Sequence, residues 1–498
     1  MPPATSEFEI RNAEYGHAGR EPQESGLRSQ VSGLSISLLA VLLAAPLALG
    51  SVHALAWSAL ALAMAALLAL WAFSVRLPAA GSRLSQSASL QPTAYSLQPV
   101  FWTPLYIPLA LFLGLSLVQY YAGGSVDPVG TREAIVKLAT ALIVFFLATQ
   151  LAATRPAVVR QWAAVICLYA SLLALFAIVQ FFTAGKAIYW VYRSRWGGWP
   201  FGPYVYHADY AGLMEMLVPI ALMYVLVLPR GDARRAPLGF GVLLAIASLL
   251  LCGSRGGFVA MLVEIVVFVV LLGATGRADR HFPSRPLLDA FSLRLLAVSC
   301  FVAGAILFVW LDPGGLWQRL LRTFSASTIN EQLEAGRLSA WRDSLRMFAA
   351  RPFAGWGLGS FELAFPRFRG FPTEYLWDHL HNDYLQALAE TGLAGALLIL
   401  SSLVLFFREL VHSALGNSAF RSALSTSHSA PSTQHSALST EHSALRLGAA
   451  IACIGLLVHS AMDFNLRIPA NAVWFAFCAG IAVAGQWPVA SRQPQALV

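Results

Sequence analysis

Charged residues are scarce in this chain. Only 12% of its 498 residues are Asp, Glu, Lys or Arg, whereas 57% are hydrophobic and the mean hydropathy is +0.63. This composition excludes an ordinary soluble domain, in which about a quarter of the residues carry charge. Many apolar runs reach the roughly 20 residues that a helix needs to cross a bilayer. We therefore predict an all-α integral membrane protein, because helices satisfy their own backbone hydrogen bonds in lipid.

Cysteine is also rare, and the 5 cysteines all fall inside predicted spans: Cys167, Cys252, Cys300, Cys453 and Cys478. We expect neither a disulfide nor a cysteine metal site. The formal net charge of +8 does not indicate a nucleic-acid partner, because the chain lacks a basic run with interleaved aromatic residues. The basic residues instead suit loops that set the orientation of membrane helices.

The hydropathy pattern predicts a polytopic bundle of about 12 transmembrane helices with one long periplasmic loop. Residues 1–30 are predicted to be a disordered cytoplasmic tail, and no cleavage site of a signal peptide follows the first apolar run. About nine spans occupy residues 31–311, the long and partly helical loop occupies 312–384, and the last spans occupy 385–498. The spans lie at roughly 32–50, 54–74, 103–121, 135–153, 158–182, 209–229, 236–252, 256–273, 294–311, 385–407, 447–463 and 470–486.

One segment between the last predicted spans has low complexity. Residues 412–446 repeat an HSAL-like unit and contain His412, His428, His435 and His442. Histidine-rich tracts sometimes bind metal, but here the spacing is loose and Glu441 is the only supporting carboxylate. We interpret the segment as a flexible cytoplasmic loop.

The predicted orientation brings scattered polar residues to one membrane face. Arginines near the membrane are retained on the cytoplasmic side, which places the 312–384 loop outside, in the periplasm of a Gram-negative cell. The polar residues on that outer face are Arg193, Arg195, His207, Asp209, Arg255, His379, His381 and Asp463. Ionisable groups near hydrocarbon are costly and usually have a partner or a substrate, so we expect an outward-facing polar site.

Three motifs belong to this region. The first heads a span and reads Gly253-Ser254-Arg255-Gly256-Gly257. The second, R-x3-W-x5-M-x4-P-x2-G-x-G-x-G-x-F, comprises Arg337, Trp341, Met347, Pro352, Gly355, Gly357, Gly359 and Phe361. The third comprises His381-Asn382-Asp383-Tyr384-Leu385-Gln386, then Glu390, Gly392, Leu393 and Gly395. In their order and spacing, these motifs resemble the O-antigen ligase and Wzy-type polymerase family. The resemblance covers about 190 to 395, although Tyr206 and His207 stand where asparagine is commoner in the family.

The resemblance implies an inner-membrane glycosyltransferase that uses an undecaprenyl-diphosphate-linked saccharide as donor, with no nucleotide sugar, metal or other cofactor. The implied partners are this donor, a glycan or lipid A-core acceptor, and membrane lipid. The motifs fit polymerisation of repeat units, attachment of a finished glycan to lipid A core, and glycosylation of protein. A polymerase of O-antigen or exopolysaccharide is our first choice, because polymerases are the more numerous.

The residue types suit this chemistry. Departure of a lipid diphosphate builds negative charge, which arginine stabilises through paired hydrogen bonds, and Arg255 and Arg195 are the candidates for this role. Histidine titrates near neutral pH, and His381 is the candidate base for the attacking hydroxyl of the acceptor. Direct displacement would invert the anomeric carbon. The alternative is that a protonated His381 binds the diphosphate.

The candidate substrate-binding residues are His379, Arg337, Arg193, His207 and Tyr384. His379 shares a face with His381 only if the backbone is extended there. Arg337, with Trp341 and Arg342, equally suits an amphipathic helix on the membrane surface. Arg255 has a structural alternative as an interfacial arginine, and Arg193 is an equal neighbour of Arg195.

Several other features have competing interpretations. The glycines of the second motif suit tight turns, with a phosphate-cradling loop as the second interpretation, and Asn382 suits capping of a helix. Three glutamates inside or near predicted spans are expected to pair with arginines or to touch substrate: Glu215, Glu264 and Glu390. The rival functions are a secondary transporter or flippase of lipid-linked saccharide, and a non-catalytic scaffold. Transporters tend to have two related halves, and we find no such internal repeat.

Overall fold

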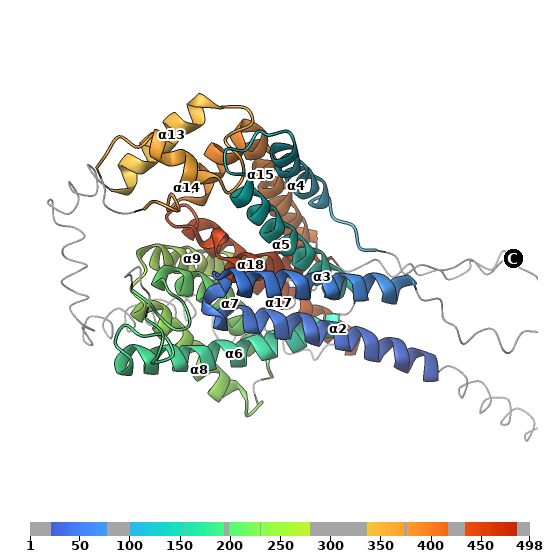
Figure 1. Ribbon diagram of the computed structural model, residues 1–498. Coiled ribbons are helices and arrows are strands. Elements are labelled where there is room, and N and C mark those ends of the chain that lie inside the picture. The colour runs from blue at the N-terminus through green and yellow to red at the C-terminus, as the bar shows by residue number, and fades with distance from the viewer. Residues whose placement is uncertain are drawn as a thin grey trace, which may run out of the picture.

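The computed structural model describes residues 21–76, 100–154, 156–193, 199–229, 231–278, 336–372, 376–416 and 434–485. These residues form helices, with no β-strand among them (Figure 1). In chain order the elements are α2 (Glu21–Leu47), η1 (Leu49–Ser51), α3 (Ala54–Arg76), α4 (Tyr106–Tyr121), α5 (Pro128–Thr154), α6 (Pro156–Thr183), α7 (His207–Val227), α8 (Arg235–Leu251), α9 (Arg255–Ala278), α13 (Arg337–Ala350), α14 (Phe361–Ala364), η3 (Phe365–Arg367), α15 (Asp383–Gly416), α17 (Gln434–His459), η4 (Asn465–Arg467) and α18 (Pro469–Val483).

The α-helices coincide with the spans predicted from hydropathy, apart from α13 and α14, which lie in the predicted long loop. The predicted span at 294–311 lies outside the described residues. In the described part of the chain, 6 helices contain segments long and apolar enough to cross a membrane: Ala54–Ser74, Pro128–Thr154, Ala157–Thr183, His207–Val227, Asp383–Val411 and Glu441–His459. Helices α2, α4, α8 and α18 contain shorter apolar segments. The all-α membrane class is therefore confirmed, whereas the total of about 12 spans remains a prediction.

Helices α7 and α17 form the centre of the bundle, and α3 and α15 lie at its periphery. The most apolar windows of α7 and α17 are 83% and 78% buried inside the protein, against 17% for α3 and 11% for α15. A helix that is apolar on all sides is expected in the interior of a membrane protein, and the sequence of α7 has this character. The polar residues on α7 and α17 therefore face other helices rather than lipid.

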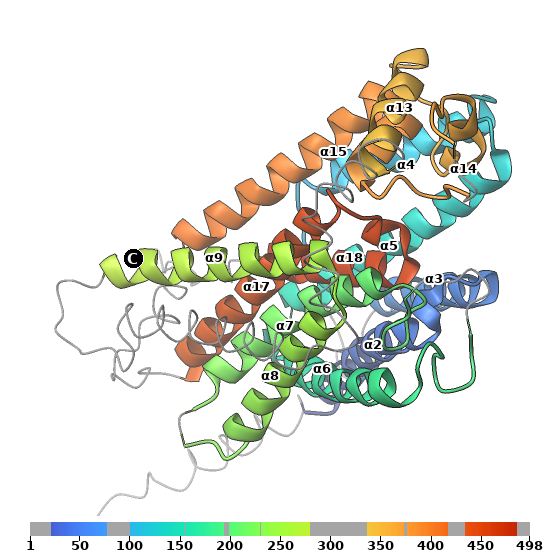
Figure 2. The same ribbon diagram turned by 90° about the vertical axis from the view of Figure 1, so that its left-hand side faces the viewer.

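A small lobe covers one end of the bundle. It comprises residues 336–372 and 376–382, with α13, α14 and η3, and it lies beside the starts of α5 and α15 and the end of α4 in both views (Figures 1 and 2). The lobe has an apolar core of its own that includes Met347, Phe361 and Phe365. This part of the predicted long loop is therefore folded around its own core and is not an extended linker between two helices.

The second and third sequence motifs contact each other where the lobe meets α15. Helix α15 is interrupted at Gly392, which has φ 64° and ψ −165°. Around this interruption, the amides of Trp356 and Gly357 donate to the carbonyls of Ala389 and Glu390, at 3.3 and 2.9 Å. These amides are occupied and do not cradle a phosphate. Such partners are needed, because unpaired peptide groups are costly in lipid.

Glycine is required at the closest approach in this contact. Gly355 has φ 68°, and a Cβ atom there would lie 2.3 Å from the carbonyl oxygen of Glu390. A residue with a side chain would be strained by the backbone angle and by this clash. The turn interpretation of the second motif is thus correct for this part of it.

Helix α17 begins at Gln434, inside the segment that we predicted to be a flexible loop at 412–446. Its HSAL units supply helix-forming Ala and Leu. Two contacts secure this part of α17: Glu441 lies 3.1 Å from Arg160, and Arg446 donates to the carbonyl of Ala482 at 2.9 Å. The predicted loop is therefore helical at least from Gln434, and residues 417–433 lie outside the described part of the chain.

Candidate active site

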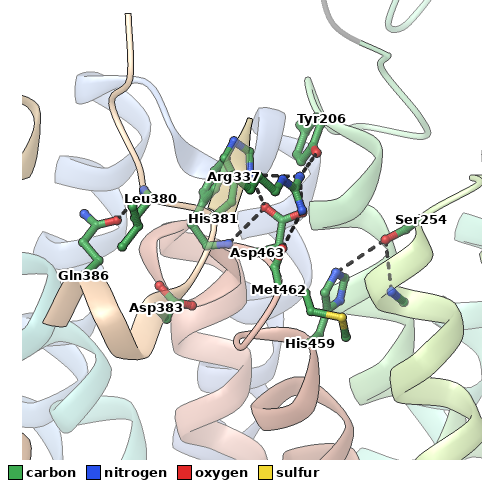
Figure 3. Close-up of polar contacts among 12 residues, drawn as sticks. Tyr206, Ser254, Arg337, Leu380, His381, Asp383, Gln386, His459, Met462 and Asp463 are labelled. Atoms are coloured by element: carbon green, nitrogen blue, oxygen red, sulfur yellow. Dashed lines mark hydrogen bonds and ion pairs between the residues drawn. The ribbon is translucent and has the colours of Figure 1, made fainter. Parts of the chain in front are cut away.

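Four segments that are far apart in sequence meet at the lobe end of the bundle (Figure 3). They are the residues before α7, the start of α13, the residues before α15, and the connection between α17 and α18. Tyr206, Arg337, His381 and Asp463 each come from a different one of these segments. The tyrosine hydroxyl and the imidazole lie 3.4 and 3.2 Å from Nη2 of the guanidinium. The predicted convergence of polar groups on one face is thus confirmed for these segments.

His381 and Asp463 form the central pair of the site. The Nδ1 atom of His381 lies 2.9 Å from Oδ1 of Asp463. The imidazole is 24% exposed, whereas the carboxyl is only 5% exposed. We assign the Nδ1 proton to this hydrogen bond, because a carboxylate only accepts. The other ring nitrogen, Nε2, is then left as an acceptor, which is the form that a general base requires.

Arg337 lies on the other side of the same carboxyl. Its Nη2 atom is 3.7 Å from Oδ2 of Asp463 and 3.2 Å from Nδ1 of His381, and its Nη1 atom donates to the carbonyl of Met462 at 2.7 Å. Because Nδ1 of His381 donates to Asp463, we interpret Arg337 and His381 as two donors that share one carboxylate. The side chain of Arg337 is 42% exposed, so it can also reach a ligand.

The charges around Asp463 determine its ionisation. Burial alone would raise the pKa of this carboxyl, but the hydrogen bond from His381 and the positive charge of Arg337 favour the ionised form, and the pKa is lowered overall. Asp463 is therefore ionised at neutral pH. An ionised Asp463 orients the imidazole and would stabilise it after proton uptake.

The backbone of His381 is unusual. Its φ is +54°, a left-handed conformation that non-glycine residues seldom adopt. The next residue, Asn382, caps α15, because its Oδ1 atom accepts from the amide of Leu385 at 3.0 Å. The helix thus begins immediately after a strained turn. Such strain persists where surrounding contacts impose it, and it is frequent at functional sites.

Aromatic rings surround the His381 imidazole on several sides. The ring centroids of Phe464, Tyr206 and Trp377 lie 4.8, 6.2 and 6.2 Å from that of the imidazole. All three aromatic residues are half-buried. Partly exposed aromatic rings next to charged groups are typical of sites that bind amphipathic ligands.

A comparison with protein families identifies part of the chain. Residues 240–400 match the family model described as O-antigen ligase (Wzy_C). This segment is therefore similar to O-antigen ligases, and we refer to it as the O-antigen ligase domain. The resemblance drawn from the sequence motifs is thereby confirmed. A search of curated proteins finds no match to the chain.

The family match indicates the general type of function. It indicates an enzyme of the ligase or polymerase type, and it implies a lipid-linked glycan donor and a glycan acceptor. The O-antigen ligase domain contains Arg255, Arg337 and His381, whereas Tyr206 and Asp463 lie outside it. The site is therefore completed by the residue before α7 and by the connection between α17 and α18, on both sides of the domain.

The other predicted residues of the O-antigen ligase domain occupy different places. Arg255 is exposed at the first position of α9, and Ser254 beside it reaches the end of α17, so Arg255 lies at the same end of the bundle as His381. Tyr384 is half-buried, and its hydroxyl donates to the carbonyl of Leu457 at 2.7 Å, which ties α15 to α17.

Three predicted site residues lie outside the O-antigen ligase domain, and of those that the structure describes, only His207 lies next to the central pair. His207 begins α7, and its ring lies 4.8 Å from that of Tyr206, next to the central pair. Arg193 is exposed after a short turn, and no contact in the described part of the chain joins it to the His381 cluster. Arg195 lies outside the described residues. The roles of these residues remain predictions.

His379 lies beside the central pair but differs from it in its environment. The centroid of its ring lies 4.6 Å from that of Phe464. Its Nδ1 atom lies 3.5 Å from Nε2 of the Gln386 side chain. Burial lowers the pKa of His379 to about 4. The neutral form fits the geometry, because an unprotonated Nδ1 can accept from the amide. His379 is therefore neutral at pH 7.

The low pKa of His379 predicts an acid-sensitive stability. In the unfolded chain the imidazole has its ordinary pKa of 6.5, whereas in the folded protein its pKa is about 4. Between these values the unfolded state binds more protons, so stability falls as the pH falls. We expect His379 to account for up to about 2 kcal/mol of lost stability between pH 7 and pH 5. Thermal unfolding in detergent at both pH values measures this loss.

A His379→Gln variant removes the titrating group and provides the matched comparison. Its unfolding should depend less on pH in that interval than that of the unaltered protein, while His53→Gln, at an exposed position, should not change the dependence. Asp463 does not contribute to the pH dependence between pH 7 and pH 5, because a carboxyl with a lowered pKa loses its stabilising effect only below its ordinary pKa of 3.8. Equal pH dependence in His379→Gln and the unaltered protein would contradict the assignment.

Sequence reasoning did not find every residue of the site. It did not single out Trp377 or Phe464, because aromatic residues are common throughout the chain. It also missed Arg467, which lies 2.8 Å from Glu390 and 3.5 Å from Asp383. A usable signal existed, since Asp463 and Arg467 are the charged residues between two apolar segments.

Proposed function

We propose that this protein is an inner-membrane glycosyltransferase that transfers a saccharide from an undecaprenyl-diphosphate-linked donor to a hydroxyl group of a sugar acceptor. The observation that carries the proposal is the half-exposed His381 paired with a buried, ionised Asp463 next to the accessible guanidinium of Arg337. This arrangement places a base and a permanent positive charge side by side, and it lies in a chain with an O-antigen ligase domain.

The proposed reaction is one displacement at the anomeric carbon. The acceptor oxygen forms a bond to this carbon as the bond between the carbon and the diphosphate oxygen breaks, so the configuration inverts. Nε2 of His381 takes the hydroxyl proton, and Asp463 stabilises the imidazolium that results. The electron pair leaves with the diphosphate.

Arginine side chains are proposed to stabilise the departing diphosphate. Arg337 is already beside the base, and Arg255 is exposed at the same end of the bundle. Guanidinium groups bind phosphate oxygens through two parallel hydrogen bonds and carry a charge at every physiological pH. We propose that they supply the positive charge for the leaving group, and that no metal ion is required. Arg195 remains a predicted third member.

The aromatic residues around His381 are proposed to bind the saccharide. Tyr206 and Phe464 are stacked, with ring centroids 5.9 Å apart, and Trp377 packs against Phe371 in the core of the lobe. Rings held in this way lose little conformational entropy when a sugar packs against them. The outer, periplasmic side of the inner membrane is the proposed location of the site, as expected from the distribution of arginines.

Purified protein in lipid vesicles tests the proposal. Supplied with an undecaprenyl-diphosphate oligosaccharide and an acceptor glycan, it should release undecaprenyl diphosphate and form a longer glycan whose new linkage has the opposite anomeric configuration. Excess EDTA should leave the rate unchanged. Product length then separates a polymerase, which builds repeats, from a ligase, which attaches one glycan.

The same vesicles test the alternative. A transporter or flippase would move the lipid-linked saccharide from one leaflet to the other without forming a glycosidic bond. Movement of intact donor in the absence of any new linkage would overturn the proposed transfer reaction. A linkage of retained configuration would overturn only the single-displacement mechanism.

A further inference from the structure

A second pair of ionisable side chains lies beneath the site. Nδ1 of His459, at the end of α17, is 2.8 Å from Oε1 of Glu215 on α7, and both side chains are fully buried, with 0% exposure. Burying ionisable groups in a membrane bundle is costly, and such groups usually have a function. The proposed transfer reaction does not use this pair directly, because no substrate can reach it.

The second imidazole nitrogen of His459 contacts the start of α9. Nε2 of His459 is 3.4 Å from Oγ of Ser254, and the same Oγ accepts from the amide of Gly257 at 3.1 Å (Figure 3). The second bond makes Ser254 the N-cap of α9. The imidazole fits closely, since a Cβ atom at Gly256 would lie 2.4 Å from Cδ2 of His459.

The order of these groups resembles a Ser-His-Glu nucleophilic triad, but burial favours another role. Ser254 is 5% exposed and His459 is 0% exposed, so a substrate has no access to the hydroxyl. The Ser254 oxygen is also engaged as a helix cap. In a catalytic triad, by contrast, the nucleophile faces the substrate.

The contacts of Glu215, His459 and Ser254 lead to two residues of the candidate active site. Arg255 directly follows Ser254 and is exposed, while the amide of Asp463 donates to the carbonyl of His459 at 3.0 Å. The imidazole therefore connects the helix that presents Arg255 with the turn that presents Asp463. The backbone around Arg255 needs such support, because Gly253, which has φ 73°, and Gly256 flank this position.

We propose that Glu215, His459 and Ser254 are positioning residues that hold Arg255 in place relative to the His381 and Asp463 pair. The proposal rests on the proposed function, in which Arg255 binds the diphosphate of the donor. Glu215 orients the imidazole, the imidazole holds the Ser254 hydroxyl, and Ser254 holds the first turn of α9. Loss of the contact would displace the Arg255 guanidinium, and a displacement of about 1 Å can cost about 100-fold in rate.

A double-mutant cycle between Ser254 and Arg255 tests the proposal. Transfer from the undecaprenyl-diphosphate donor is measured as kcat/KM for unaltered protein, Ser254→Ala, Arg255→Ala and the double variant. We expect Ser254→Ala to lower kcat/KM by about 10- to 100-fold when Arg255 is present, and by less than about twofold in the Arg255→Ala background, because the two residues act as a unit. Ser254→Thr keeps a hydroxyl and should restore most of the rate.

Two further variants separate positioning from folding. His459→Asn retains a donor for Glu215 but withdraws the nitrogen that faces Ser254, so the cap on α9 stays intact; it should show the same dependence on Arg255. Ser401→Ala, on the exposed side of α15, is the matched control and should be neutral. Thermal unfolding of each variant in detergent shows whether it is folded.

The outcomes are distinct. Equal losses from Ser254→Ala with and without Arg255, or no loss at all, would overturn the positioning role while leaving the transferase proposal intact. Absence of transfer by the unaltered protein would instead overturn the proposed function, and this inference with it.

Discussion

Saccharide transfer by a His381→Ala variant is expected to fall by about 10²- to 10⁴-fold, which is the usual contribution of a general base. The variant loses the group that accepts the hydroxyl proton, but Asp463 keeps Arg337 as a partner, at 3.7 Å. The carboxylate is therefore not left uncompensated, and the protein should remain folded. Turnover with the undecaprenyl-diphosphate donor in vesicles measures the change, with thermal unfolding as the test of folding.

The choice of variants distinguishes a base from a diphosphate ligand. His381→Gln retains a hydrogen-bond donor but cannot accept a proton at neutral pH, so it should be nearly as inactive as His381→Ala if His381 is the base. A cationic ligand predicts the reverse, namely that His381→Lys preserves activity. His53→Ala, an exposed histidine, is the control and should be neutral. Unchanged turnover in His381→Ala would remove this residue from the mechanism.

Replacement of Arg467 by methionine is expected to destabilise the protein by about 3–5 kcal/mol, as when one partner of a buried ion pair is lost. Nη1 of Arg467 lies 2.8 Å from Oε2 of Glu390, and its Nε atom lies 3.5 Å from Oδ1 of Asp383. The side chain of Glu390 is fully buried. Without the guanidinium, a carboxylate would remain in the interior with its main counter-charge removed. Equilibrium unfolding in detergent measures the loss.

The matched control is Arg234→Met. Nη2 of Arg234 lies only 2.7 Å from Oδ2 of Asp232, but the arginine side chain is 62% exposed, so water replaces the partner and stability should not change. Combining Arg467→Met with Glu390→Gln should recover part of the lost stability, because the uncompensated charge is then gone. A similar loss in the single and double variants would show that the ionic contact is not the cause.

Hydropathy was enough to predict the long apolar helices of the bundle. The bilayer imposes segment lengths, so these helices fall on predicted spans, whereas α13 and α14 lie in the predicted long loop. Motif spacing identified His381 and Arg255, and it identified Arg337, whose guanidinium lies beside the imidazole in the folded chain. These predictions depend on motifs that are local in the sequence, and the roles of the three residues remain predictions.

Pairings between distant residues could not be predicted in the same way. His381 and Asp463 are 82 positions apart, and Arg467 and Glu390 are 77 apart. Which side chains meet depends on how far each helix is rotated about its axis, and uniformly apolar helices carry little information about that rotation. The start of α17 was missed for a related reason. Its HSAL repeats have the composition of a polar linker, and the contact between Glu441 and Arg160 that stabilises the helix joins residues far apart in the sequence.

The interruption of α15 at Gly392 also constrains how the protein is made. Between Ala389 and Ala394 the helix takes part of its hydrogen bonding from residues 352–357, which precede it in the chain. A ribosome therefore delivers these partners before the segment that needs them. The amides of Leu393 and Ala394 bond to the carbonyls of Pro352 and Phe353, so the final position of α15 and the docking of the lobe depend on each other.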